Sequence, residues 1–243
     1  MSSRILAFDT ATEHLSVALQ AGGRVFVHEG AGGAQASVAL IPAIFALLGE
    51  AGVGLADLDA IAFGRGPGAF TGLRTACSVA QGLAFGAGKP VLPIDTLLAV
   101  AEDARAGAPH AMQVWATMDA RMDEVYAARY AFADGAWSVL DAPMLTRPEA
   151  LNARWQAEPP AHVAGNALGA FGDRLQTGAA RRSAEARPRA AAMLPLAQSM
   201  WSADGGVDAA LALPLYLRDK VAQTTLERDA TRAAKVALVE GAK

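Results

Sequence analysis

Short apolar runs bounded by polar and turn-forming residues dominate the first hundred positions of the chain. Strands are predicted at residues 5–9, 15–20, 24–28, 59–63 and 90–94. Apolar residues at helical spacing predict helices at residues 42–48, 71–85 and 96–105. Between the second and third strands, Gly22-Gly23 permits a tight turn because glycine accepts positive φ. The predicted order of elements is therefore βββαβαβα.

The second half of the chain starts in the same way. Residues 113–119 form an apolar run that closes on Asp119, as residues 5–9 close on Asp9, and the two aspartates are 110 residues apart. Further strands are predicted at residues 124–132, 136–140 and 162–164, and helices from residue 148, at 167–175 and at 193–201. Residues 178–192 are weakly patterned and 213–217 are predicted to be extended.

This offset suggests an internal duplication. The predicted fold is α/β, with two RNase H-like lobes, each a mixed sheet of βββαβα-type order. We expect an N-terminal, partner-binding lobe at residues 1–108 and a C-terminal lobe at 109–220. A helical tail is expected at 221–243, packed back or frayed.

Composition narrows the class of protein. With 53% hydrophobic residues in 243, the chain can form a globular core. Its longest apolar stretch, residues 38–48, is far shorter than the ~18 residues that cross a bilayer. A single cysteine fits a reducing compartment, so a cytoplasmic location is expected. The net charge of −3 argues against a chain that holds nucleic acid by its own field.

A glycine-rich loop, Gly64–Gly72, connects a predicted strand to a predicted helix. Such loops bind phosphate through free backbone N–H groups, but neither the P-loop nor the dinucleotide motif can be read here. An anion or partner contact is one interpretation; the other is a tight connection in which Thr71 caps the helix. The candidate contact residues are Arg65, Gly66, Pro67, Gly68, Thr71 and Arg74.

The helix at residues 71–85 is apolar around most of its circumference, with one narrow polar stripe. A helix of this kind needs cover on more than one side. Either a partner protein supplies it, which we favour, or the other lobe or the helix at 42–48 does. The candidate interface residues are Leu73, Ala76, Ala80, Leu83 and Ala84, and a charge at Ala76, Ala80 or Ala84 is expected to break a complex.

No residue pattern predicts a catalytic, cofactor or metal site. Asp9 resembles the first-strand aspartates that hold magnesium or phosphates in sugar-kinase-like ATPases, yet no glycine-rich turn follows it or Asp119. A turn or capping role for Asp9 is therefore favoured. The four histidines lack metal-ligand spacing, and Cys77 lies among apolar residues. A stand-alone ATPase or hydrolase using Asp9 and the Gly64–Gly72 loop remains the alternative.

Four segments together resemble the TsaB (YeaZ) family of the tRNA threonylcarbamoyladenosine pathway. They are residues 5–12 (ILAFDTAT), 61–74 (IAFGRGPGAFTGLR), 80–84 (AQGLA) and 214–218 (PLYLR). The match spans about residues 4–221, and its glycine-rich block is specific. One departure is Ala36-Ser37, which stands where the family commonly has His-Ser.

The resemblance implies an ASKHA-type fold of two related lobes and a role without chemistry of its own. Members support TsaD, a metal-binding transferase that modifies adenosine 37 of tRNA, and pair with it through helices of the N-terminal lobe. The resemblance also implies a ternary complex with the ATPase TsaE, contact with tRNA only through the complex, and a homodimer when TsaD is absent. The helix at 71–85 is the expected contact element, and no cofactor or membrane is implied.

Overall fold

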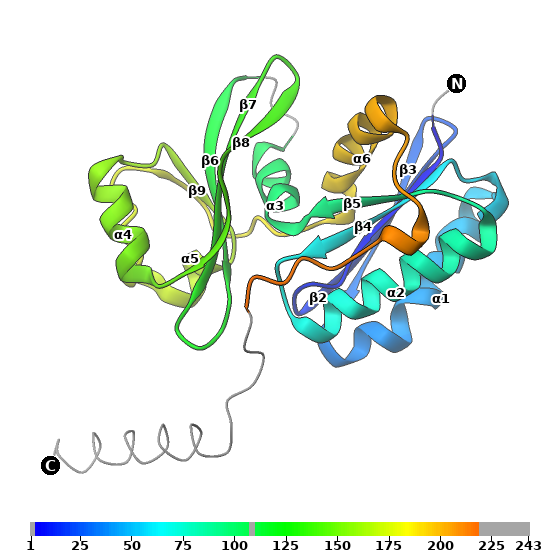
Figure 1. Cartoon of the computed structure of the whole chain (residues 1–243), viewed down its shortest axis with the longest axis horizontal. Coiled ribbons are helices and arrows are strands. Elements are labelled where there is room, and N and C mark those ends of the chain that lie inside the picture. Colours follow the sequence, from blue (N-terminus) through cyan, green and yellow to red (C-terminus); the bar gives the residue numbers. More distant parts are fainter. Residues whose placement is uncertain (1–2, 107–109, 219–243) are drawn as a thin grey trace, which may run out of the picture.

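The structure, a computed structural model, describes residues 3–106 and 110–218. It consists of two lobes side by side, each built on a five-stranded mixed sheet, with α3 and α6 between the sheets (Figure 1). The predicted helical tail at 221–243 lies outside the described residues.

The first sheet has the strand order β3-β2-β1-β4-β5. Its strands are β1 (Ile5–Asp9), β2 (His14–Ala21), β3 (Arg24–Ala31), β4 (Ala60–Gly66) and β5 (Val91–Asp95). The helices of this half are α1 (Ala36–Ala51), α2 (Phe70–Ala87) and α3 (Thr96–Arg105), with single 3₁₀ turns at Gly33–Gln35 and Leu55–Asp57. Strand β1 is antiparallel to β2 and parallel to β4.

The second half repeats this order of elements. Its strands are β6 (Met112–Asp119), β7 (Val125–Ala133), β8 (Ala136–Thr146), β9 (His162–Ala164) and β10 (Arg181–Ser183). Its helices are α4 (Pro148–Ala157), α5 (Ala167–Phe171) and α6 (Ala190–Asp204), with 3₁₀ turns at Gly172–Arg174 and Ala209–Leu211. Read from β8, the sheet order is β8-β7-β6-β9-β10, which matches the first sheet strand for strand. The predicted fold class of two related α/β lobes is confirmed.

Each sheet is covered on both faces. On one face of the first sheet, Leu6, Phe8 and Phe63 pack with buried residues of α1 and α2 such as Leu40 and Ala80. The opposite face packs against α6. In the second lobe, α3 covers one face of the sheet, and α4 and α5 cover the other. Because strands are buried on both faces, β1 reads as a continuous apolar run.

The last helix of each repeat packs on the sheet of the other repeat. Helix α6 belongs to the second repeat but packs mainly on β1 and β2 of the first sheet. Val207 then pairs with Val91 of β5, and the turn at Ala209–Leu211 lies on α2. Residues 190–212 therefore pack mainly on the first lobe, while α3 of the first repeat packs chiefly on the second sheet.

Several predicted boundaries also change. Helix α1 begins at Ala36, six residues before the predicted start, and Pro42 lies inside it. Helix α6 likewise begins before its predicted start and contains Pro195. Strand β10 falls in the segment whose pattern predicted nothing, and the helix predicted at 167–175 ends at Phe171 and continues as a 3₁₀ turn.

One helical segment, Gly33–Ala51, is long and apolar enough to cross a membrane by length and composition alone, which the count of consecutive apolar residues missed. In the structure Leu40, Ile44 and Leu48 of this segment lie in the core against the first sheet. A third of its most apolar window is buried. The segment therefore covers the first sheet with one face and exposes apolar side chains on its opposite face.

Candidate functional site

The glycine-rich connection between β4 and α2 packs tightly on the turn after β1. The Thr10 hydroxyl donates to the Gly72 carbonyl at 2.8 Å, and the Ala69 N–H donates to the Ala11 carbonyl at 2.8 Å. A Cβ atom at Gly72 would overlap the Thr10 carbonyl oxygen, and one at Gly68 would lie 2.6 Å from the Ala11 Cβ. These glycines serve the close approach of two backbones, as the structural interpretation of the loop predicted.

Asp9 lies at the centre of this packing and is buried. Its carboxylate accepts hydrogen bonds from the Ala11 N–H at 2.7 Å and from the Thr96 hydroxyl at 3.1 Å. Thr96 in turn accepts from the Gly66 N–H at 3.1 Å. A Cβ at Gly64 would overlap the carboxylate. Asp9 therefore ties together the ends of β1 and β4 and the start of α3, and it has no open face toward a ligand.

Burial raises the pKa of Asp9 from 3.8 to about 7, despite the two hydrogen bonds that favour its charged form. Between these values the folded state binds more protons than the unfolded state, so the free energy of unfolding falls as pH rises through this window. We expect a slope on the order of 1 kcal/mol per pH unit. Urea unfolding at pH values across the window measures it; Asp9→Asn should flatten the profile, and an unchanged profile would contradict this assignment.

The two loop arginines are already engaged within the chain. The Nε of Arg65 donates to Asp95 at 2.5 Å, and the Arg74 guanidinium lies 3.8 Å from the centre of the Phe70 ring. Arg74 also donates to the Tyr216 hydroxyl at 3.2 Å. The predicted cap is wrong, because the helix N-cap is Ala69 and no side chain caps it. Arg65 and Arg74 thus contact different partners within the chain, Arg65 on β5 and Arg74 at Phe70 and Tyr216.

The interface predicted on α2 rests on a premise that the structure contradicts. Four of its five residues, Leu73, Ala76, Ala80 and Ala84, are buried within this chain, and Leu83 is partly buried against the same core. Their cover comes from α1, the sheet and the segment after α6. The side chains of Cys77 and Gln81 both donate to the Ala212 carbonyl of that segment, at 3.3 and 2.9 Å.

A different apolar surface is exposed on the same pair of helices. Val38 and Phe45 of α1 are 73% and 50% exposed, Ile41 is also exposed, and Phe85 of α2 is 86% exposed. We call these four residues the α1–α2 face. The two helices lie next to each other on one side of the first sheet (Figure 1). The sequence pattern did not predict this face, because the helix was expected to begin at Pro42, whereas α1 begins at Ala36 and so carries Val38 and Ile41 as well.

The segment 213–218 runs from the first lobe to the second. The Leu215 N–H donates to the Arg65 carbonyl at 2.7 Å, and the Tyr216 ring centre lies 5.2 Å from that of Phe70. At the other end, Arg218 donates to the Ala120 carbonyl at 3.0 Å and pairs with Glu124 at 2.6 Å. A cavity of about 200 Å³ lies beneath this segment.

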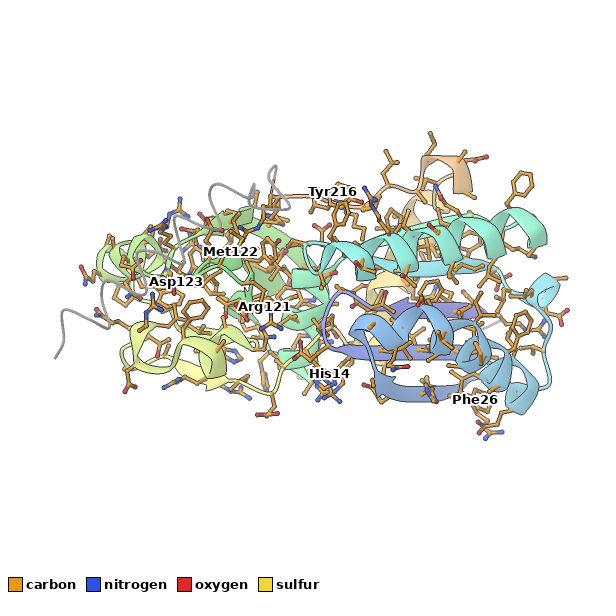
Figure 2. The ribbon with its side chains drawn as sticks, turned by 90° about the horizontal axis from the view of Figure 1, so that it is seen from below. His14, Phe26, Arg121, Met122, Asp123 and Tyr216 are labelled. Atoms are coloured by element: carbon orange, nitrogen blue, oxygen red, sulfur yellow. The ribbon has the colours of Figure 1, made fainter. Side chains whose placement is uncertain are left out.

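Arg218 holds an unusual turn between β6 and β7. Arg121, Met122 and Asp123 all have φ between 53° and 64°, a region that L-residues with a Cβ rarely adopt and that costs each of them about 1–2 kcal/mol. Asp123 is also bound by both Nη atoms of Arg174 at 2.5 and 2.9 Å. Figure 2 shows this turn and Tyr216 in neighbouring parts of the molecule.

We expect Arg218→Ala to destabilise the fold by about 1–3 kcal/mol, because the carbonyls of Ala120 and Arg121 and the partly buried carboxylate of Glu124 lose their donor. Amide hydrogen exchange should speed up first in residues 120–124. Arg121→Ala is the matched control, since its side chain is 77% exposed. Equal effects of the two variants would show that Arg218 does not hold the turn.

Neither a metal nor a nucleophile can be assigned. Within residues 3–106 and 110–218, no three His, Cys, Asp or Glu side chains are grouped so as to hold a metal ion. Cys77 is buried, and burial raises the pKa of its thiol. Asp119, the counterpart of Asp9, pairs with Arg121 at 3.0 Å.

Comparison with known proteins decides the family. The family model described as "TsaD: tRNA N6-adenosine threonylcarbamoyltransferase" matches residues 31–225. The tRNA threonylcarbamoyladenosine biosynthesis protein TsaB of Escherichia coli K12 is 38% identical over 225 residues, covering 90% of this chain and 96% of the relative. The chain belongs to the TsaB (YeaZ) family. The TsaB of Haemophilus influenzae is 37% identical, with 89% of this chain and 94% of that protein covered.

Solved structures agree with the TsaB fold. YeaZ from Pseudomonas aeruginosa superimposes with a TM-score of 0.81 at 40% identity, and the match covers 89% of this chain and all of that one. A second structure of the same identity and TM-score is described as an uncharacterized protein with similarity to peptidase YEAZ. The TsaD-family match fits a TsaB chain whose two lobes repeat one topology.

Proposed function

We propose that this TsaB-family chain is a non-catalytic subunit of the system that forms N6-threonylcarbamoyladenosine at position 37 of tRNA, and that it binds and supports a TsaD-like transferase. The pathway rests on the names of its relatives, which are threonylcarbamoyladenosine biosynthesis proteins at 37–38% identity over most of their length. The observation that carries the subunit role is the exposed α1–α2 face.

The α1–α2 face has the character of a protein contact. Phe45 and Phe85 present large aromatic groups on adjacent helices, and Val38 and Ile41 extend the surface along α1. Large exposed apolar groups on two adjacent helices are typical of protein interaction sites. Around it α2 exposes Arg74 and Ser78, which supply a polar rim of the kind found at protein interfaces. The N-terminal lobe is therefore the proposed partner-binding lobe, with Leu83 at its margin.

Four further parts belong to the same proposal. A TsaE-like ATPase joins the complex, and tRNA is contacted through the complex rather than by this chain, whose net charge is −3. When the TsaD-like subunit is absent, the same face pairs two copies of this chain. The proposed location is the cytoplasm, where tRNA is modified.

The absence of catalysis is supported by the state of the two strand-end aspartates. Asp9 is buried with both oxygens hydrogen-bonded to the chain itself, and Asp119 is paired with Arg121. A phosphate or a metal ion at Asp9 would need the Thr10–Gly72 packing to open. This geometry favours the non-catalytic subunit over the alternative function, a stand-alone ATPase or hydrolase that uses Asp9 and the Gly64–Gly72 loop.

Co-expression with the TsaD-like subunit of the same organism, followed by size-exclusion chromatography, tests the subunit role. The two chains are expected to elute together, and the purified chain alone should hydrolyse neither ATP nor peptides. Failure to co-elute, or ATP turnover that disappears in Asp9→Ala, would overturn the proposal in favour of the stand-alone enzyme.

A further inference from the structure

A second cavity, of about 390 Å³, lies between the lobes in a region that the proposed partner contact does not use. It is bounded by the ends of β4 and β5, by α3 and α6, and by the hairpin of β7 and β8. Its volume is in the range of small-molecule sites, which are mostly apolar with a few placed polar groups. Here the lining combines apolar side chains with charged ones. The apolar ones include Leu98, Phe132, Trp137, Leu196 and Met200, and the charged ones are Arg65, Asp95, Glu102 and Arg105.

Trp137 is held in one orientation within this cavity. Its Nε1 donates to the Glu102 carboxylate at 2.7 Å, and Glu102 is itself bound by Arg105. The ring packs at a tilt against Phe132, with centres 5.2 Å apart, and edge-on against Tyr130 at 6.3 Å. A half-buried indole fixed in this way offers a rigid surface on which a flat ring can stack at little entropic cost.

Arg65 and Asp95, which line the cavity, keep hydrogen-bonding groups that no other residue of the described chain uses. The Arg65–Asp95 pair is joined through Nε, so the guanidinium Nη donors and the second carboxylate oxygen have no hydrogen bond that the described residues provide. The Tyr130 hydroxyl is also buried without a hydrogen-bond partner among the described residues. Within this part of the chain, the free donors of Arg65 and the free acceptor of Asp95 therefore lie next to each other.

We propose that this cavity binds a small, neutral, planar aromatic molecule with a carboxamide-type edge. The ring stacks on Trp137, the carbonyl oxygen accepts from Arg65, and the N–H donates to Asp95. A carboxylate in place of the amide would meet the Asp95 charge, and an ammonium would meet Arg65, so a neutral edge with both functions fits best. A saturated ring would lose the flat contact with the indole.

Benzamide is a suitable probe, with binding followed by saturation-transfer NMR and by tryptophan fluorescence. Saturable binding of benzamide is expected, with benzoate and cyclohexanecarboxamide each about tenfold weaker, since each loses one of the two matched features. Equal binding of all three compounds, or no saturable binding of benzamide, would overturn the proposal.

Two neighbouring residues of α6 provide a test variant and a control for the place where benzamide binds. Ala203 lines the cavity and is exposed, whereas Ser202 is exposed but does not line it. Ala203→Trp should fill the cavity mouth and abolish benzamide binding, while Ser202→Trp should leave it unchanged. Thermal unfolding of both variants checks that the fold is retained. Benzamide binding unaffected by Ala203→Trp would show that it binds elsewhere. Because the α1–α2 face is untouched, co-elution with the TsaD-like subunit should persist in Ala203→Trp, whichever way the binding result falls.

Discussion

Replacing Phe45 and Phe85 together with aspartate is expected to abolish co-elution of this chain with a TsaD-like subunit. Both rings are exposed on adjacent helices, so the substitution places two charges on the proposed contact without entering the core. Central aromatic residues of interfaces contribute about 2 kcal/mol or more each, a factor of about 30 in affinity for each residue. Size-exclusion chromatography and a titration of one subunit against the other measure the loss.

Val139→Asp provides the matched control. Val139 is a similarly exposed apolar residue, but it lies on β8 in the other lobe. It should leave both the complex and the fold unchanged. If Val139→Asp weakens the complex as much as the double substitution does, or if the double variant still binds normally, the α1–α2 face is not the contact. Charges at Ala76, Ala80 or Ala84 give no such test, because these residues are buried and the fold itself would fail.

Gly72→Ala is expected to destabilise the chain by about 3 kcal/mol or more. The added methyl group would overlap the Thr10 carbonyl oxygen, which lies in backbone rather than in a flexible side chain. Moving α2 away would break the Thr10–Gly72 and Ala11–Ala69 hydrogen bonds that join it to the first strand. Urea unfolding followed by circular dichroism measures the change.

Gly82→Ala, on the same helix, is the control for intrinsic helix propensity. A Cβ at Gly82 meets no atom within 4 Å, so only the gain in helix propensity remains. This variant should be more stable than the parent by about 0.5–1 kcal/mol. If both glycine variants change stability by similar amounts, the close approach at Thr10 does not restrict position 72.

Much of the fold could be predicted because its strands are short, apolar and bounded by turn residues. The run that ends at Asp9 and the run that ends at Asp119 belong to corresponding central strands, β1 and β6, and their spacing revealed the duplication. Strand β10, in contrast, consists of Arg181, Arg182 and Ser183. It has no apolar signal, because only its pairing with β9 defines it.

The partner-binding surface was harder to predict, because which apolar residues stay exposed depends on contacts between residues distant in sequence. The apolar excess on α2 was seen correctly, but its cover includes a segment more than 130 residues later, through Ala212. Sequence spacing cannot tell a helix covered by its own chain from one that awaits a partner. The α1–α2 face was not predicted, because proline is common at helix starts and Pro42 was therefore taken as the first residue of the helix. In the structure Pro42 lies inside α1, so the residues before it are also helical.

The direct test of the account is the N6-threonylcarbamoyladenosine content of tRNA, measured by liquid chromatography and mass spectrometry of its nucleosides. Cells lacking this chain should lose the modified nucleoside. Re-expression of the parent chain, or of folded Asp9→Asn, should restore the modified nucleoside. Re-expression of the double variant at Phe45 and Phe85 should not restore it. Unchanged levels of the modified nucleoside in cells without the chain would contradict the proposed function.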